Sequence, residues 1–378
     1  MKVIHIITSL YTGGAERALY NLLQGGLNEQ FETHVISLSD AGTIGPQIER
    51  LGVPVICLGM PSGRPTLASV IKLRRVIKDL QPDLIHGWMY HGNIVTMIAR
   101  IATMTRPALV WGVRHSLYQI ENEKRLTQLV IKANRFLSNS PDMILYNSRL
   151  SQQQHEQFGF QGTNSQVIPN GINLKQFCFS DAERTRIRTE LGIPTDAIVA
   201  GHVARLHPMK DHPLFLQAAI DIAKRFEQFH CILIGRDVNM ENEGLAKYIP
   251  EELQNRFHLL DERSDISAVM SAMDIFTLTS TWGEAFPNVL GEAMATGLPC
   301  VTTNVGDSAL IVGDCGQIVE PQDKAALVGA IESLVVLSST DRQQIGVRAR
   351  RRIEEYFSLN AIVKEYSNLY ESLMSQAS

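Results

Sequence analysis

The chain has 378 residues, 44% of them hydrophobic and 20% charged, and its formal net charge is −4. This length exceeds one ordinary hydrophobic core and predicts two domains of comparable size in a soluble globular protein. No stretch approaches the roughly eighteen consecutive apolar residues of a membrane span. The segment from Met1 to Ile7 runs straight into a strand pattern without a signal-peptide cleavage site, so we expect a cytoplasmic protein.

Cysteine and histidine usage argues against a metal centre. The five cysteines are scattered without a CxxC pair, and several lie in apolar strand-like runs, so we expect reduced core residues. Zinc-ligand spacing is absent, and no Asp-x-Asp pair occurs that would hold a divalent metal against a diphosphate. The sequence therefore predicts no metal and no other cofactor, and bound phosphate must be neutralised by side chains and helix ends.

The first part of the chain alternates between strand-like and helix-like stretches. Apolar runs predict strands near residues 2–8, 33–38, 53–57, 83–86, 108–113, 142–146 and 165–168. Helix-like stretches intervene near residues 15–25, 66–80, 92–103, 121–138 and 148–157. This alternation is typical of βαβ units that build a mainly parallel sheet.

The loop after the first strand carries two adjacent glycines, Gly13 and Gly14, in front of a predicted helix. Glycines let a ligand approach the backbone at a helix amino end, where free N–H groups attract anions, and a tight turn is the alternative. The loop has neither the GxGxxG fingerprint nor a Walker sequence. This argues against a nicotinamide-dependent enzyme and against a P-loop nucleotidase.

The net charge hides a difference between two parts of the chain. Residues 1–177 contain 17 Lys and Arg against 11 Asp and Glu, whereas residues 178–378 contain 18 against 28. A basic half suits an anionic partner such as an anionic inner membrane surface or a lipid-linked diphosphate, with solvated helix faces as the alternative. Nucleic acid is not expected, because basic and aromatic residues do not interleave. Two predicted helices carry the clusters, one with Arg64, Lys72, Arg74, Arg75 and Lys78, the other with Lys124, Arg125, Lys132 and Arg135 among apolar Leu126, Leu129, Val130, Ala133 and Leu137.

A second alternation follows residues 169–173, which are dense in turn residues and mark a hinge candidate. We expect two doubly wound domains, whose strand carboxyl ends bind ligands on either side of one cleft. Apolar runs predict strands near residues 197–203, 230–234, 256–260, 274–279, 299–303 and 317–319, and helices lie near 212–226, 265–272, 287–296 and 322–337.

Two loops of this second domain combine charges at predicted strand carboxyl ends. Arg205 and Lys210 follow its first strand, where a guanidinium fork suits phosphate. Glu284 and Glu292 flank Pro287, whose fixed φ suits the first position of a helix. That helix end would attract an anion, and the two carboxylates would accept hydroxyl groups, as of a sugar. The alternative is a solvated basic loop, with Glu284 stabilising the helix dipole and Glu292 in solvent.

Four motifs in this order resemble a retaining family 4 glycosyltransferase of the GT-B fold, as in bacterial surface polysaccharide and lipopolysaccharide biosynthesis. The resemblance spans nearly the whole chain. It implies an α/β protein with two doubly wound Rossmann-like domains facing each other across a cleft: an acceptor domain at 1–175, a nucleotide-sugar domain at 176–357, and a C-terminal helix at 358–378 that can pack back on the first domain. The motifs are Gly13-Gly14-Ala15-Glu16, Pro169-Asn170-Gly171-Ile172-Asn173, the Arg205 and Lys210 pair, and the Glu284 to Glu292 spacing followed by Ala293 to Pro299.

The resemblance also implies roles for single residues. Arg205 and Lys210 would hold the diphosphate of a nucleotide sugar, most commonly a UDP-sugar, while Glu284 would hold the sugar and Glu292 the ribose. His115, after a strand, resembles the family histidine beside the donor sugar, with a packing histidine as the alternative. His86 also ends a predicted strand and is a second candidate to face the cleft, again with a packing histidine as the alternative. Gly13 and Gly14 would close over the diphosphate, and further donor contacts would come from Ala285, Phe286, Pro287, Asn288 and Val289.

Two loops depart from the family pattern. The run from Ile234 to Asp237 lacks the second glycine often found there, and Asp261 stands where the family often has glycine. Both departures are expected at the nucleotide-base end, where Arg263 is a candidate contact.

The predicted reaction is metal-independent transfer, with retention, of a sugar to a saccharide or lipid-linked acceptor. Arg205, Lys210 and helix N–H groups would stabilise the leaving phosphate. The acceptor attacks from the same face, because Glu292 is assigned to the ribose and leaves double displacement by paired carboxylates unsupported. The alternatives are a sugar-nucleotide epimerase or a phosphorylase of the same fold and, in another class, a non-catalytic scaffold or binding protein.

Overall fold

The computed structural model describes residues 1–60, 66–118, 120–122 and 124–377, and Arg64 of the first basic cluster lies outside them. The chain divides into two compact units. Unit 1 consists of Met1–Gly171 and Leu359–Ser378, and unit 2 of Ile172–Ser358. The boundaries therefore differ slightly from those expected at residues 175 and 357, and the last helix is counted with unit 1.

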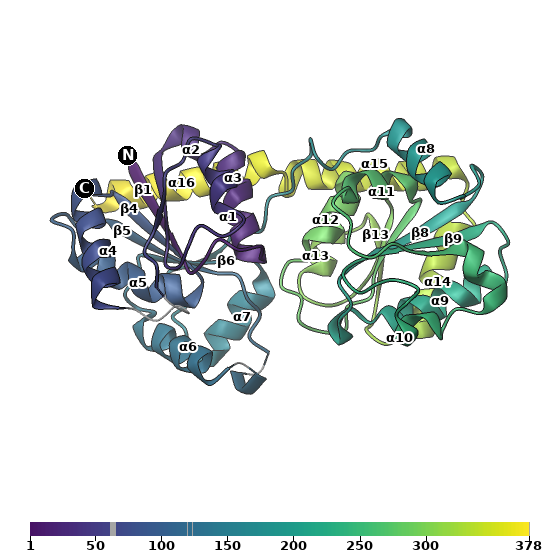
Figure 1. Cartoon of the computed structure of the whole chain (residues 1–378), viewed down its shortest axis with the longest axis horizontal. Coiled ribbons are helices and arrows are strands. Elements are labelled where there is room, and N and C mark those ends of the chain that lie inside the picture. The colour runs from purple at the N-terminus through teal and green to yellow at the C-terminus, as the bar shows by residue number, and fades with distance from the viewer. Residues whose placement is uncertain (61–65, 119, 123, 378) are drawn as a thin grey trace. The chain divides into compact units, whose positions relative to one another are not determined.

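Unit 1 contains a parallel sheet in which strands pair in the order β3-β2-β1-β4-β5-β6-β7 (Figure 1). The first strand lies inside the sheet, between β2 and β4, and the order reverses there, as in doubly wound folds. Every strand of this sheet pairs in parallel with its neighbours. The strands are β1 Lys2–Ile7, β2 Glu32–Ser37, β3 Val55–Cys57, β4 Leu84–Trp88, β5 Ala108–Val113, β6 Met143–Tyr146 and β7 Ser165–Val167.

Helices α4 and α7 of unit 1 begin at side chains that satisfy free N–H groups of the first turn. Thr66 and Ser69 form a capping box at α4, and the Ser148 hydroxyl accepts the Ser151 N–H at 3.0 Å in front of α7. The helices are α1 Gly14–Gln24, α2 Leu27–Gln30, α3 Gly45–Glu49, α4 Leu67–Leu80, α5 Met89–Ile101, α6 Arg125–Leu137, α7 Arg149–Phe158 and α16 Leu359–Ala377, with a 3₁₀ turn at Ile120–Asn122.

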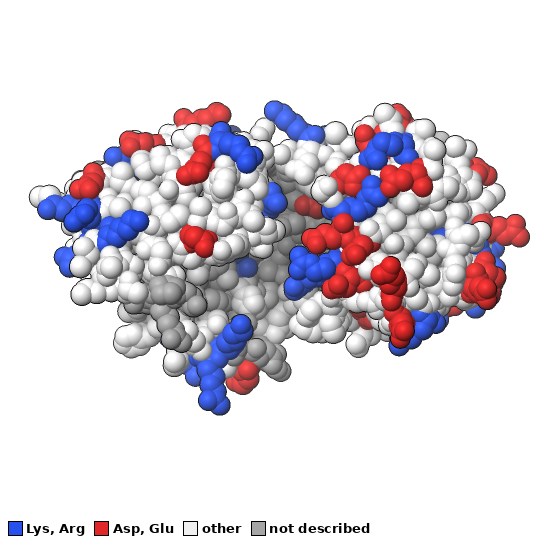
Figure 2. Space-filling model, in the orientation of Figure 1, with Lys and Arg blue, Asp and Glu red and all other residues white. Residues whose placement is uncertain are grey.

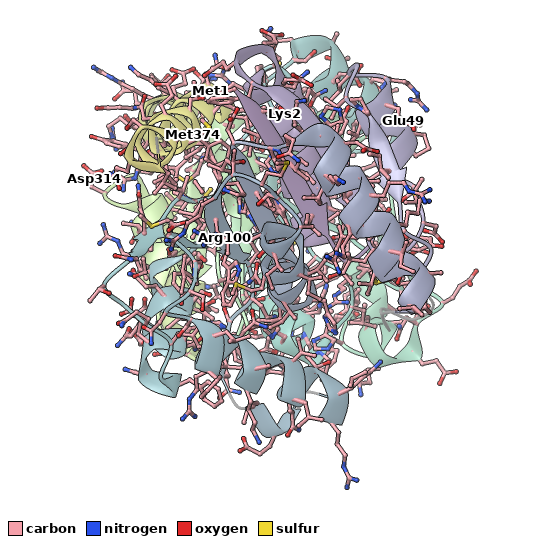
Figure 3. All side chains as sticks on the ribbon, turned by 90° about the vertical axis from the view of Figure 1, so that its left-hand side faces the viewer. Met1, Lys2, Glu49, Arg100, Asp314 and Met374 are labelled. Carbon is pink, nitrogen blue, oxygen red and sulfur yellow. The ribbon has the colours of Figure 1, made fainter. Side chains whose placement is uncertain are left out.

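Helix α16 is part of the core of unit 1. Its apolar side chains, including those of Ile362, Val363 and Tyr366, share one buried cluster with β1, α1 and β4. The Tyr370 hydroxyl lies 2.6 Å from Nδ1 of His86, which is fully buried and has a pKa well below its usual value because burial disfavours the charged ring. His86 is therefore a packing histidine. The N-terminal end of β1 and Met374, near the end of α16, lie at the same side of this unit (Figures 1 and 3).

Unit 2 contains a second parallel sheet, with the strand order β10-β9-β8-β11-β12-β13. Its strands are β8 Ile198–Val203, β9 Phe229–Ile234, β10 Phe257–Leu259, β11 Ile275–Leu278, β12 Cys300–Thr303 and β13 Gly316–Val319. Its helices are α8 Asp181–Glu190, α9 His212–Ala223, α10 Glu243–Ala246, α11 Ile266–Ala272, α12 Asn288–Ala295, α13 Ser308–Val312, α14 Lys324–Val335 and α15 Ser339–Tyr356, with 3₁₀ turns at Pro208–Lys210 and Glu251–Arg256.

Both sheets confirm the predicted α/β class with two doubly wound, Rossmann-like parallel sheets. Helices α8 and α15 and the short helices α2, α3, α10 and α13 were not predicted. The cysteines were expected in the core, but Cys178 is exposed and Cys57 is only partly buried. In the described residues, helices long and apolar enough to cross a bilayer are absent.

Candidate functional site

The loop after β8 carries Arg205 and Lys210 and is held by hydrogen bonds between side chains and backbone. Nδ1 of His207 accepts the Met209 N–H at 3.2 Å, which opens the 3₁₀ turn, and Asp211 caps α9 by accepting the Leu214 N–H at 3.2 Å. The Thr279 hydroxyl, just beyond β11, donates to the Lys210 carbonyl at 2.8 Å. This loop is therefore tied to the neighbouring strand end.

Lys210 and Glu284 meet at these strand ends. The Lys210 ammonium forms an ion pair with Oε1 of Glu284, and the Ser280 hydroxyl donates to the same oxygen at 2.6 Å. Glu284 is only 7% exposed. The structure thus brings together the two side chains that sequence assigned to diphosphate and sugar, and it adds Ser280, which sequence reasoning missed.

Helix α12 starts one residue later than predicted. Pro287 is not its first helical residue but the residue in front of it, with an extended backbone at φ −74° and ψ 95°. The N–H groups of Asn288 and Val289 lie in the first turn, where the helix dipole gives a positive potential, and the Leu290 N–H donates to the Pro287 carbonyl at 3.1 Å. Phe286 is buried against Phe357, with ring centroids 5.7 Å apart, so its side chain serves the core.

Gly306, which sequence reasoning missed, fixes the backbone beside Glu284. Its φ of 62° is left-handed, and a Cβ there would lie 2.6 Å from the Glu284 carbonyl oxygen and 2.8 Å from that of Ala285. The next residue, Asp307, donates its N–H to the Ala285 carbonyl at 2.9 Å. A glycine a few residues after a predicted strand was the signal available in the sequence.

Arg205 is exposed and, within the described part of the chain, its guanidinium has no acceptor partner. The loop after β9 approaches its backbone closely. A Cβ on Gly235 would lie 1.9 Å from the Ala204 carbonyl oxygen, and the Leu206 N–H donates to the Arg236 carbonyl at 2.9 Å. Arg205 is therefore held by its backbone while its side chain remains available to a ligand.

Arg263 has a structural role that sequence did not indicate. Its guanidinium donates twice to the Asp265 carboxylate, at 2.8 and 2.7 Å, and once to Glu190 of α8 at 2.6 Å. These partners raise the pKa of Arg263 above its usual value. Three of its N–H donors therefore fasten α8 to the loop in front of α11. Its contact with a nucleotide remains a prediction.

The two departures from the family glycine pattern occupy left-handed backbone. Asp237 has φ 66° and Asp261 has φ 53°, a region that glycine adopts freely and that aspartate tolerates better than most residues. Oδ1 of Asp261 accepts the Asp237 N–H at 3.0 Å, and Oδ2 accepts from Asn239 at 3.2 Å. Side-chain hydrogen bonds thus replace the conformational freedom of glycine.

Glu292 lies half-buried in the second turn of α12. Its neighbours along the helix, Leu290, Ala293 and Met294, are buried in the core of unit 2. The predicted role at a ribose remains a prediction.

In unit 1, the predicted glycines open helix α1. Gly13 is its N-cap with an extended backbone, and a Cβ there would meet only the flexible Glu16 carboxylate, at 2.3 Å. A Cβ on Gly14 would meet no atom within 4 Å. Burial raises the pKa of Glu16. Since neither glycine has a left-handed φ, the fold itself does not require glycine at Gly14.

His115 follows β5 in unit 1. Its carbonyl oxygen accepts the Ser151 hydroxyl of α7 at 2.6 Å, and its half-buried ring lies edge-on to Tyr90, with centroids 6.3 Å apart. Its position relative to a sugar remains a prediction. Over the residues that the structure covers, no group of three or more His, Cys, Asp and Glu side chains gathers as a metal site would require.

Comparison with known proteins relates the chain to glycosyltransferases. The family model of glycosyltransferase family 4 matches residues 12–176, and that of group 1 glycosyl transferases matches residues 197–336. The chain is similar to the Escherichia coli UDP-Gal:α-D-GlcNAc-diphosphoundecaprenol α-1,3-galactosyltransferase, with 25% identity over 98% of this chain and 96% of that one. It is also similar to the putative glycosyltransferase EpsF of Bacillus subtilis, with 24% identity over 80% and 79% of the two chains.

Among solved structures, Anabaena HepE in complex with UDP superposes with a TM-score of 0.83 and 25% identity over 98% of this chain and all of that one. The protein is an enzyme of the glycosyltransferase class with the two-sheet GT-B fold. The two family matches together cover most of the chain, which belongs to the glycosyltransferases that combine a family 4 domain with a group 1 domain.

Proposed function

We propose that the protein transfers a sugar from a UDP-sugar, with retention and without a metal, to a saccharide or lipid-linked acceptor in the assembly of a bacterial surface polysaccharide. The observation that carries this proposal is the ion pair between Lys210 and Glu284 beside the amino end of α12. Cation, carboxylate and helix N–H groups lie together, which matches the mixed chemistry of a sugar diphosphate.

The relatives support the choice of donor and acceptor. HepE was solved with UDP, and the Escherichia coli relative is named for a UDP-galactose donor and a diphosphoundecaprenol-linked acceptor. In the present chain, Arg205 has a guanidinium available for a diphosphate, while Glu284 offers a buried carboxylate to sugar hydroxyls.

The chemistry follows from where charge develops. When the bond from the anomeric carbon to the diphosphate breaks, negative charge grows on the leaving phosphate, and Arg205, Lys210 and the first N–H groups of α12 stabilise it. Oε1 of Glu284 already accepts from Lys210 and Ser280, so this carboxylate is assigned to orienting the sugar rather than attacking it. The acceptor then attacks from the face that the phosphate leaves, and the phosphate takes its proton.

The test combines donor and acceptor screening with product stereochemistry. The purified chain is incubated with UDP-glucose or UDP-galactose and a lipid-diphosphate sugar acceptor, with and without EDTA, and the anomeric coupling of the product is read by ¹H NMR. An α-linked product formed equally in EDTA is expected. A β-linked product contradicts retention, loss of activity in EDTA contradicts metal independence, and isomerised donor without transfer indicates an epimerase. Dependence on inorganic phosphate indicates a phosphorylase, and no binding of UDP in calorimetry indicates a scaffold.

We also propose that unit 1 associates with anionic membrane through α6. Leu126, Leu129 and Phe136 are 51%, 64% and 85% exposed on this helix, which favours a membrane surface over the alternative of a solvated polar face. Lys124, Arg125, Lys132 and Arg135 are exposed beside them, and Lys and Arg side chains project at the lower edge of unit 1 (Figure 2). An exposed apolar stripe flanked by cations is typical of helices that lie in a bilayer interface.

Vesicle flotation tests this association. Binding is expected to vesicles with phosphatidylglycerol but not to pure phosphatidylcholine, and to weaken as salt is added. Leu129→Ser with Phe136→Ser should abolish it, whereas Arg74→Glu with Arg75→Glu on α4 serves as the control for the other basic cluster. Equal binding to neutral vesicles, or loss only in the α4 variant, contradicts the assignment to α6.

A further inference from the structure

A cavity in unit 2 lies at the sheet edge opposite the Lys210 and Glu284 loops. Residues of its wall directly precede strands, with Asp274 in front of β11 and Pro299 in front of β12, whereas the Lys210 and Glu284 loops follow strands. In a parallel sheet the amino and carboxyl ends of strands form opposite edges. Its volume of about 540 Å³ is in the range of small-molecule pockets, roughly 300–1,000 Å³.

The cavity combines apolar walls with arginines. Phe179, Met273, Leu298 and Val347 supply apolar surface, and Phe179 and Val347 keep 48% and 68% of their surface exposed at its mouth. Helix α15, which contributes Val347, packs closely on the turn after α12: a Cβ on Gly346 would lie 1.9 Å from the Gly297 carbonyl oxygen. The cavity is therefore a built part of the fold.

Arg342 is a buried cation in the wall of this cavity. Its side chain lines the cavity and the residue is only 9% exposed, yet no described carboxylate forms an ion pair with it. Its Nη1 donates to the Leu334, Val335 and Leu337 carbonyls, at 3.2, 3.2 and 2.6 Å, at the end of α14. Among the described residues, Nε and Nη2 have no hydrogen-bond partner. A buried cation without an anion is costly, so this position favours an anionic ligand.

The other charged side chains around the cavity have ionic partners or lie at its rim. Arg184 and Arg188 share the single Asp274 carboxylate, each at 2.7 Å, so this cluster keeps one net positive charge, and Arg350 binds Glu354 at 2.8 Å. Asp181 is an exposed carboxylate at the rim and opposes an anion there. Among the arginines of the cavity wall, Arg342 is thus the one without a carboxylate partner in the described residues, and the Arg184, Arg188 and Asp274 cluster adds to the positive potential.

We propose that this cavity binds a small organic anion, with its carboxylate, sulfonate or phosphate on Arg342 and its apolar body between Phe179, Met273, Leu298 and Val347. The site is distinct from the donor site, because the two occupy opposite edges of the same sheet. Helix α12 connects them: its amino end adjoins Glu284, while Thr296 and Gly297 at its carboxyl end line the cavity.

The test uses 8-anilinonaphthalene-1-sulfonate, a fluorescent anion with an aromatic body, on the whole chain. One bound equivalent is expected in the presence of saturating UDP. Val347→Asp and Phe179→Asp, both at exposed positions, should weaken binding by roughly tenfold or more, whereas Gln344→Asp, exposed on α15 outside the cavity wall, should not. N-phenyl-1-naphthylamine lacks the anionic group, and inorganic phosphate lacks the aromatic body. Both should bind at least roughly tenfold more weakly than the sulfonate.

Arg342→Gln separates the anion contact from packing. This variant should lose most of the affinity for the sulfonate and keep that for N-phenyl-1-naphthylamine. This variant can fail to fold because it loses the hydrogen bonds at the end of α14. In that case Val347→Asp and Phe179→Asp still test whether the sulfonate binds in this cavity. Displacement of the sulfonate by UDP, equal affinity in Val347→Asp and the parent chain, or equal affinity for the neutral probe would overturn the proposal.

Discussion

Lys210 and Glu284 lie 74 residues apart in the sequence, and their side chains form a largely buried ion pair at adjoining strand ends. The pairing has two consequences for a ligand-free protein. It holds both side chains in place before a donor arrives, and it makes each charge depend on the other for stability. Removal of one partner therefore affects both the fold and the chemistry.

Single and double replacement of this pair should separate these effects. Lys210→Met and Glu284→Gln are each expected to lower the free energy of unfolding by roughly 3 kcal/mol, because the remaining charge is left buried without its partner. The double variant should regain most of this stability but none of the transfer activity, with kcat/KM at least about 100-fold below the parent in all three proteins. Urea unfolding and donor kinetics measure the two quantities. Full activity in the double variant would remove the pair from the site.

Gly14→Ala tests whether the glycine loop serves a ligand. Because a methyl group there meets no atom within 4 Å, the variant should be as stable as the parent or more so. Transfer activity should nevertheless fall about tenfold or more if a diphosphate approaches this backbone. Gly329→Ala is the matched control, since it also meets no atom but lies in α14. Thermal unfolding and kinetics measure both variants, and equal activity in both would assign Gly14 to a simple turn.

Asp237→Gly and Asp261→Gly test the two left-handed positions. Asp237→Gly should be neutral or stabilise by about 0.5 kcal/mol, because it relieves a left-handed residue whose carboxylate makes no hydrogen bond among the described residues. Asp261→Gly should destabilise by about 1 kcal/mol, because it also removes two hydrogen bonds. Chemical unfolding of both variants measures their free energies of unfolding, and Asp237→Gly should be the more stable. A more stable Asp261→Gly variant would contradict this explanation.

Because of the buried His155, we expect the free energy of unfolding to decrease in mild acid. Its Nδ1 lies 2.7 Å from the Ser151 carbonyl and its Nε2 2.7 Å from the Tyr90 hydroxyl, and burial lowers its pKa to about 4. The unfolded chain therefore takes up a proton below its pKa of about 6.5 while the folded chain does not, and stability falls as the pH decreases from there to about 4. At pH 5 the expected loss is about 2 kcal/mol for this residue.

The pH effect is measured by urea unfolding at pH 7.5 and pH 5. His155→Gln should be less stable than the parent at pH 7.5 but lose about 2 kcal/mol less between the two pH values. Other buried histidines, such as His5 with a pKa lowered to about 3, keep part of the slope in both proteins. Identical slopes for variant and parent would show that His155 is charged in the folded state.

The sequence predicted those parts of the fold that repeat a simple pattern. Alternating apolar runs located the strands of both sheets, and their carboxyl ends located Arg205, Lys210 and Glu284. Helix α15 was not predicted because its buried residues, such as Gly346 and Ala349, are small and are scattered among arginines, so the apolar periodicity is weak. Helix α8 was not predicted for a similar reason, since its buried positions include Arg188.

The part of the site that sequence missed depends on contacts between distant residues. Ser280 and Gly306 act on Glu284 through a hydroxyl and a close backbone approach, and neither residue type is distinctive by itself. Arg263 was assigned to a ligand because a lone arginine in a loop gives no sign of its acidic partners. The carboxylates of Glu190 and Asp265 give Arg263 a structural role that the sequence did not indicate, and α8, which carries Glu190, was not predicted.

The return of α16 to unit 1 also sets the order in which a ribosome can complete the two units. Residues 172–358 are contiguous, so unit 2 has its entire core before α16 is synthesised. Synthesis of unit 1 begins first, but this unit lacks Tyr366, Tyr370 and their neighbours until the last twenty or so residues emerge. Until then the side chains of His86 and Trp88, which α16 covers, stay exposed. The unit translated second is therefore the first that can finish folding, and a nascent chain arrested before α16 should expose unit 1 to proteases while unit 2 resists them.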